Sequence, residues 1–182
     1  MADLVPCNNP YWRELFYRWF LSMTAHGQNI DRQHGNNTSP LLVGAQGYRK
    51  STFCRILLPP ELRFGYTDSI DFKSKQDAER SLGRFFLINI DEFDQISVNQ
   101  QGFLKHLLQK PVANLRKPYG TAIQEIRRYA SFIATSNQKD LLTDPQRQPP
   151  FHLHRSHRPH PYQCHHQLPA TLRTSHGCHS QR

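Results

Sequence analysis

The stretch Pro40–Phe53, PLLVGAQGYRKSTF, decides the fold: an apolar run leads into a glycine loop, then into a lysine and a serine. Gly44, Lys50 and Ser51 match a phosphate-binding loop, whose pattern is Gly, four residues, Gly, Lys, and Ser or Thr. The one departure is Arg49, which takes the place of the second glycine. The stretch therefore predicts a phosphate site, or else a strand–turn–helix unit that contains glycine by chance.

The residues of this loop are suited to a nucleotide. Small residues such as Gly44 and Gly47 let backbone N–H groups surround phosphate oxygens. Lys50 is placed to reach the β- and γ-phosphates, and the hydroxyl of Ser51 is placed to ligate Mg²⁺. We expect these residues to bind ATP and Mg²⁺, together with the neighbours Arg49 and Thr52.

Arg49 can be interpreted in two ways. If its position requires a positive φ angle, a side chain there costs about 1 kcal/mol or more. If the position is already helical, the arginine is harmless and its charge points at the phosphates. The sequence alone leaves both interpretations open.

Two further apolar runs end in polar residues. FFLINIDEFD carries Asp91 and Glu92 at the end of its apolar part, and SFIATSN ends at Asn137. In an ATPase site, Asp91 would support the Mg²⁺, and Glu92 would orient and deprotonate the attacking water. Asn137 would hydrogen-bond the γ-phosphate, while Asp94 is better suited to capping a helix. The alternative interpretations are structural: Asp91 and Glu92 would belong to an acidic turn, and Asn137 would be a turn residue.

Apolar runs alternate with helical patterns along the first 144 residues. This alternation predicts an α/β fold with a mostly parallel sheet flanked by helices, the P-loop NTPase core of the ASCE or AAA+ type. We expect a helical segment (1–36), an ATPase core (37–144) and an unstructured tail (145–182). The expected strands are 40–44, 84–94 and 129–137, and the expected helices are 10–25, 50–57, 74–83 and 101–109.

The net charge of the 182-residue chain is +9, and it is unevenly distributed. The tail after Asp144 has five Arg and no acidic residue, so it supplies more than half of that charge. Eight of the eleven His lie there as well, but their spacing is irregular and does not predict a zinc site. The sequence shows no signal peptide, disulfide framework or membrane span, so we expect a cytoplasmic protein.

The segment between the last two apolar runs is basic. It carries Arg116, Lys117, Arg127 and Arg128 around a turn expected at 118–121. Such a hairpin could contact a nucleic-acid backbone. A solvated charged hairpin is an equally good interpretation.

Four stretches together resemble the virulence-associated protein E family, namely QGYRKSTFCRILLPPEL, YTDSIDF, LINIDEFD and ASFIATSNQKDLLTDP. The resemblance implies a P-loop ATPase similar to superfamily 3 helicases and phage-type primase-helicases. It further implies an oligomeric protein, such as a ring, that acts on DNA in replication or in mobile elements. The family accepts RKS in its loop, and the basic hairpin would be its DNA-contacting element.

The chain departs from the family at both ends, so we expect a truncated form. After LLTDP the family continues with Gly-Ser-Arg-Arg-Phe, whose arginines would act at the γ-phosphate, whereas this chain has QRQPPFHLHR. Shifted by one base, codons for this tail can encode Ser-Gly-Ser-Arg-Arg-Phe-Ile-Cys-Ile, which suggests a frameshift near Pro145. The alternatives to an ATPase are a non-catalytic nucleic-acid-binding module and a non-functional fragment.

Overall fold

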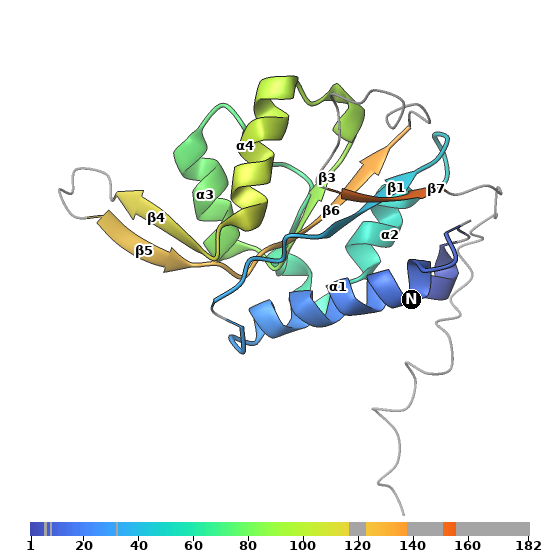
Figure 1. Cartoon of the computed structure of the whole chain (residues 1–182), viewed down its shortest axis with the longest axis horizontal. Coiled ribbons are helices and arrows are strands. Elements are labelled where there is room, and N and C mark those ends of the chain that lie inside the picture. The colour runs from blue at the N-terminus through green and yellow to red at the C-terminus, as the bar shows by residue number, and fades with distance from the viewer. Residues whose placement is uncertain (6, 8, 32, 117–122, 138–150, 156–182) are drawn as a thin grey trace, which may run out of the picture.

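A five-stranded sheet, in which every pair of neighbouring strands is parallel, forms the centre of the protein (Figure 1). The computed structural model describes residues 1–5, 7, 9–31, 33–116, 123–137 and 151–155. The sheet order is β2-β3-β6-β1-β7. Its strands are β1 (Ser39–Val43), β2 (Tyr66–Thr67), β3 (Leu87–Ile90), β6 (Ser131–Ser136) and β7 (Phe151–Arg155).

Helices cover both faces of this sheet, as the alternation of side chains along the strands requires. Leu41 and Val43 of β1 pack with α3 (Lys75–Arg84) and α4 (Val98–Gln109). Leu42, between them, packs on the other face with α1 (Trp12–Gly27) and α2 (Lys50–Ile56). The expected parallel sheet flanked by helices is therefore confirmed, in three layers.

Polar caps set where two of the helices begin. Ser74 Oγ accepts a hydrogen bond from the backbone N–H of Asp77 at the start of α3. At the start of α4, Ser97 and Gln100 form a capping box, in which each side chain bonds the other residue's backbone N–H. This box explains why α4 begins three residues earlier than the apolar pattern indicated.

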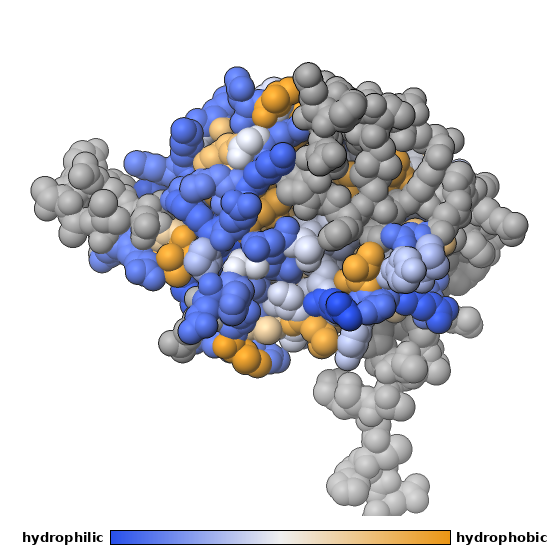
Figure 2. Space-filling model, viewed as in Figure 1, coloured by the Kyte–Doolittle hydropathy of each residue, from blue (hydrophilic) through white to orange (hydrophobic). Residues whose placement is uncertain are grey.

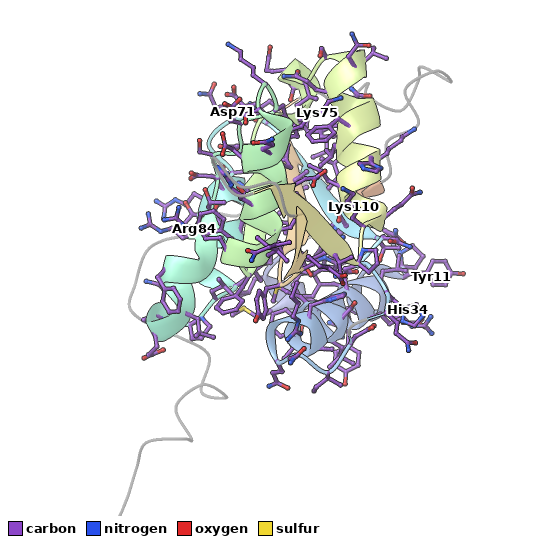
Figure 3. The ribbon with its side chains drawn as sticks, turned by 90° about the vertical axis from the view of Figure 1, so that its left-hand side faces the viewer. Tyr11, His34, Asp71, Lys75, Arg84 and Lys110 are labelled. Atoms are coloured by element: carbon purple, nitrogen blue, oxygen red, sulfur yellow. The ribbon has the colours of Figure 1, made fainter. Side chains whose placement is uncertain are left out.

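The described residues also form short 3₁₀ turns: η1 (Ala2–Leu4) precedes α1, η2 (Pro60–Gly65) connects α2 to β2, and η3 (Phe93–Gln95) connects β3 to α4. Lys75 and Arg84 mark the two ends of α3, and Lys110 follows the end of α4 (Figure 3). Lys110 Nζ lies 2.6 Å from Glu79 Oε1, so an ion pair joins the two helices on this face.

A separate antiparallel pair, β4 (Val112–Arg116) and β5 (Ile123–Arg127), leaves the main body as a ribbon (Figure 1). This pair corresponds to the hairpin expected from the sequence, although the turn at 118–121 lies outside the described residues. The base of the ribbon is tied to α3, since the N–H groups of Tyr129 and Ala130 both donate to Leu82 O.

The expectation of an unstructured tail is wrong at Phe151–Arg155, which forms β7 beside β1. An edge strand offers unpaired N–H and C=O groups, which pair with any extended segment whatever its side chains. Apolar periodicity, the signal used for the other strands, therefore could not predict this one. The rest of the expected tail lies outside the described residues.

The described surface is largely hydrophilic in the view of Figure 2, where apolar residues form small, separate patches. The most exposed large apolar side chains are scattered over several elements; among them are Tyr11, Tyr17, Ile30, Phe64 and Val98. Within the described part of the chain, no helix has the length and apolar character needed to cross a membrane.

Candidate phosphate and magnesium site

The carboxyl ends of β1, β3 and β6 meet at one edge of the sheet. Val43 is in register with Ser136, and Ile90 is in register with Ala134. The residues that follow these three parallel strands are thus brought together from distant parts of the sequence. In open parallel sheets, ligands bind at this edge.

The loop after β1 contains two residues with a positive φ angle. Gly44 N–H donates to Ser136 O at 3.1 Å, which ties the loop to β6. Gly47 has a φ of 90°, and Arg49 has a φ of 52° in the left-handed region. The first of the two interpretations of Arg49 therefore holds: the position is one that glycine would occupy without cost.

Lys50 lies at the centre of this edge. Its Nζ donates to Gly44 O at 2.7 Å, to Ala45 O at 3.0 Å and to Asn137 Oδ1 at 2.8 Å. Burial lowers the pKa of the Lys50 ammonium, while the charges of Asp91 and Asp94 raise it. The ammonium is thus held by neutral oxygens at the place where the pattern expects phosphate oxygens.

A hydroxyl–carboxylate pair lies beside the lysine. Ser51 Oγ donates to Asp91, at 2.9 Å from Oδ1 and 3.1 Å from Oδ2. The Thr135 hydroxyl, from β6, donates to the same Oδ1 atom. Asp91 is therefore fixed between α2 and β6, and Ser51 and Asp91 lie next to each other as a shared Mg²⁺ site requires.

The oxygen ligands at this edge fit Mg²⁺, which prefers hydroxyl and carboxylate oxygens and keeps several water ligands. Among the described residues, no group of three or more His, Cys, Asp or Glu side chains could hold a metal ion. A magnesium ion at this edge would have Ser51 and Asp91 as its protein ligands.

Glu92 follows Asp91 in an unusual conformation, with φ 50° and ψ 50°. Non-glycine residues with positive φ tend to cluster at functional sites. Two of the three such residues in the described chain, Arg49 and Glu92, lie at this edge; the third is Asn29. Glu92 and Thr52 are both exposed, which leaves them accessible to a ligand.

Asp94 proves to be part of this edge, although the sequence suggested only a helix cap. Its Oδ1 accepts from Ser136 Oγ at 2.7 Å and from Asn137 N–H at 3.4 Å. Sequence reasoning missed these contacts because they join residues more than forty positions apart. The available signal was the second aspartate after β3, matched by a second hydroxyl before Asn137.

The basic residues of the hairpin differ in burial and in hydrogen-bond partners where the structure describes their side chains. Arg128 is 1% exposed, and its guanidinium donates to the carbonyls of Leu107, Leu108, Lys110 and Ala130. The expected nucleic-acid contact through Arg128 is therefore wrong, because its donors bind the end of α4 inside the protein. This guanidinium satisfies carbonyls that a helix end leaves unpaired.

The other three basic residues remain predictions as nucleic-acid contacts. Arg127 donates from Nη2 to His26 O at 3.0 Å, and its guanidinium carbon lies 4.6 Å from the centre of the Tyr129 ring. Only the backbone of Arg116 is described, and Lys117 lies outside the described residues.

The fold and this site define a three-layer α/β protein with a polar site at the carboxyl ends of adjacent parallel strands. The sequence profile of the virulence-associated protein E-like domain matches residues 1–157. The chain therefore belongs to the virulence-associated protein E-like domain family, as the four motif stretches indicated. No curated protein matches the chain.

Similar solved structures are remote in sequence. An A form apo structure of the NrS-1 C-terminal region aligns with a TM-score of 0.49 at 12% identity, over 80% of this chain and 37% of that chain. Another apo structure of the same region gives 0.47 at 13% identity, over 79% and 38% of the two chains. C. elegans PCH-2 gives 0.45 at 12% identity, over 87% and 46%. The chain spans less than half the length of each.

Proposed function

We propose that this chain is an ATP-binding domain that holds Mg·ATP at the carboxyl edge of its sheet, as part of a protein that acts on DNA. The observation that carries the proposal is the convergence of three segments on one point. Lys50 Nζ meets Asn137 Oδ1 across 87 residues of sequence, and Ser51 Oγ meets Asp91 across 40. A chance glycine turn would have no reason to gather these four side chains.

Each residue has a role that its position supports. The Lys50 ammonium would exchange its present acceptors for phosphate oxygens, with Gly44, Gly47 and Arg49 shaping the loop around them. Ser51 and Asp91 would hold Mg²⁺, which when bound offsets the charge of the phosphates.

Two further residues would act on the terminal phosphate. Asn137 would donate its amide to the γ-phosphate once Lys50 turns toward the nucleotide. Glu92 would orient and deprotonate the attacking water, a role that its exposed carboxylate allows.

Binding of Mg·ATP tests this proposal. We expect Lys50→Ala to weaken binding at least about tenfold in isothermal titration calorimetry, because a charge-assisted bond to phosphate is lost. Lys105→Ala is the matched control: it removes a charge from the exposed side of α4 and should leave binding unchanged. Equal binding by wild type and Lys50→Ala, or no binding by either, would contradict the proposal.

Hydrolysis is a separate part of the proposal. The resemblance assigns a role at the γ-phosphate to an arginine segment that this chain lacks after Pro145. We therefore expect the chain to bind Mg·ATP and to turn it over slowly, with Glu92→Gln reducing the residual rate further. A phosphate-release assay measures both rates. An oligomeric ring, which the family resemblance implies, stays a prediction.

The β4–β5 ribbon favours a second candidate function, nucleic-acid binding without catalysis. The ribbon stands outside the main sheet and carries Arg116 and Lys117 next to its turn in the sequence. We expect the double variant Arg116→Ala/Lys117→Ala to weaken binding to single-stranded DNA and to reduce its salt dependence. If Lys50→Ala leaves that binding unchanged and no nucleotide binds, this second function replaces the first.

A further inference from the structure

Asp94 connects the acidic turn to the end of β6 through both of its carboxylate oxygens. Oδ1 accepts from Ser136 Oγ and Asn137 N–H, while Oδ2 accepts from Gln95 Nε2 at 3.2 Å. The cap of η3 is Glu92, whose carbonyl accepts from Gln95 N–H at 2.8 Å. Among the described residues, two of the three hydrogen bonds that Asp94 accepts from other residues therefore come from the last residue of β6 and the residue after it, not from its own turn.

A second carboxylate holds β6 in the same way. The Thr135 hydroxyl donates to Asp91, and the Ser136 hydroxyl donates to Asp94. Successive side chains of a strand point to opposite faces, so the two carboxylates hold the strand end from its two sides. Thr135 and Ser136 are each 1% exposed, so solvent does not compete for either hydroxyl.

Asn137 directly follows Thr135 and Ser136, whose hydroxyls donate to Asp91 and Asp94. Its Oδ1 atom is the only side-chain acceptor that Lys50 Nζ has among the described residues; the other two acceptors are the loop carbonyls of Gly44 and Ala45. A small displacement of the β6 end would move Asn137 away from the ammonium. In the described part of the chain, Asp94 makes no hydrogen bond to Lys50 or to the loop; its charge raises the pKa of the Lys50 ammonium, and its hydrogen bonds reach the site through Ser136 and Asn137.

We propose that Asp94 is a positioning residue, which fixes the end of β6 through Ser136 and thereby aims the Asn137 amide at the terminal phosphate. This inference deepens the proposed function and rests on it. It predicts a specific defect in recognising the third phosphate. The loop, Lys50 and Ser51 would still hold the first two phosphates.

The preference for Mg·ATP over Mg·ADP is the quantity that tests this role. We expect Asp94→Ala to reduce the ratio of the two affinities about tenfold and to leave ADP affinity unchanged. Asp94→Asn should retain the ratio, because its amide oxygen still accepts from Ser136. Ser136→Ala, which removes the shorter of the two hydrogen bonds that Asp94 accepts from this strand end, should also lower the ratio, and the double variant should lose less than the sum of the two single losses.

Asp3→Ala is the matched control. It removes a carboxylate that pairs with Arg13 at 2.7 Å on the exposed surface, far in sequence from the site. The ratio should be unchanged in this variant. An unchanged ratio in Asp94→Ala would overturn the proposal. A parallel loss of ATP and ADP affinity in both Asp94→Ala and Ser136→Ala would overturn it too, since that result means a structural role only.

A readout without nucleotide separates this proposal from the proposed function. The side-chain amide resonance of Asn137 should move in Asp94→Ala and Ser136→Ala and stay in place in Asp94→Asn. If wild type binds no nucleotide, the proposed function fails while this resonance still tests the positioning. An Asn137 resonance that is the same in all variants would overturn the positioning whether or not nucleotide binds.

Discussion

Two cations, Lys50 and Arg128, both bind backbone carbonyls, and the sequence predicts both as ligand contacts. Lys50 is half-buried at the sheet edge and binds two loop carbonyls and one amide oxygen. Arg128 is buried under the end of α4 and binds four carbonyls. Burial lowers the pKa of the Arg128 guanidinium to about 10, which leaves it charged at neutral pH.

The two cations differ in whether another hydrogen-bond donor could replace them at the carbonyls that they bind. Ala45 and Asn137 are exposed, so water can replace the ammonium at two of its three acceptors; the third, Gly44, is buried but belongs to the same loop. Leu107 and Leu108 end a helix inside the protein, where a carbonyl without a donor costs free energy. We infer that Lys50 can exchange its partners for a ligand and that Arg128 is structural.

The largest expected effect is on stability. Arg128→Ala should lower the free energy of unfolding by about 3 kcal/mol or more, because it leaves buried carbonyls unpaired. Lys50→Ala should cost less than about 1 kcal/mol, since water can bond its partly accessible acceptors. Urea denaturation measures both. Equal losses in the two variants would remove the distinction between the two cations.

Arg49 gives a smaller effect of the opposite sign. Arg49→Gly should raise the free energy of unfolding by about 1 kcal/mol, because φ at this position is 52° and glycine adopts it without strain. Arg49→Ala keeps the strain and serves as the control for the lost charge. Thermal denaturation of both variants measures the difference; a stabilised alanine variant would show that charge, not backbone strain, is the cause.

The smallest effect concerns pH at the base of the hairpin, next to Arg128. Burial lowers the pKa of His26 below its ordinary 6.5, and the charges of Arg128, Arg127 and His34 add to this while Asp31 opposes it. The folded state thus favours the neutral ring of His26. This preference stabilises the folded protein above pH 6.5, and the stabilisation is lost as the pH falls below 6.5.

His26→Leu should flatten this pH dependence between pH 7 and pH 5, because the leucine has no proton to gain. Urea unfolding at several pH values is the measurement. A wild-type curve that is already flat in this window would mean that the ring of His26 titrates alike in both states.

Much of the site could be predicted because its signals are local. Gly44, Asp91 and Asn137 each follow a buried apolar run, and parallel strands bring such residues to one edge. Arg128 could not be predicted, since its burial depends on the end of α4, about twenty residues earlier in the chain. Adjacent Arg127 and Arg128 look alike in sequence, and only the packing around them separates their roles.

The contacts of Asp94 and the strand β7 also escaped prediction, for a different reason. Both depend on pairing between distant segments: Asp94 with the end of β6, and Phe151–Arg155 with the edge of β1. Backbone pairing at a sheet edge needs no apolar pattern. A frameshifted tail could therefore still supply an edge strand, and the coding DNA around Pro145 tests that origin.

The most direct test of the contrast between the two cations follows both by NMR while Mg·ATP is added. The Lys50 ammonium and the Asn137 side-chain amide should shift together and saturate, because phosphate replaces their mutual contact, whereas Arg128 Nε should stay in place. If Lys50 and Asn137 do not move at millimolar Mg·ATP, or if Arg128 moves with them, Lys50 is not the exchangeable cation of a phosphate site.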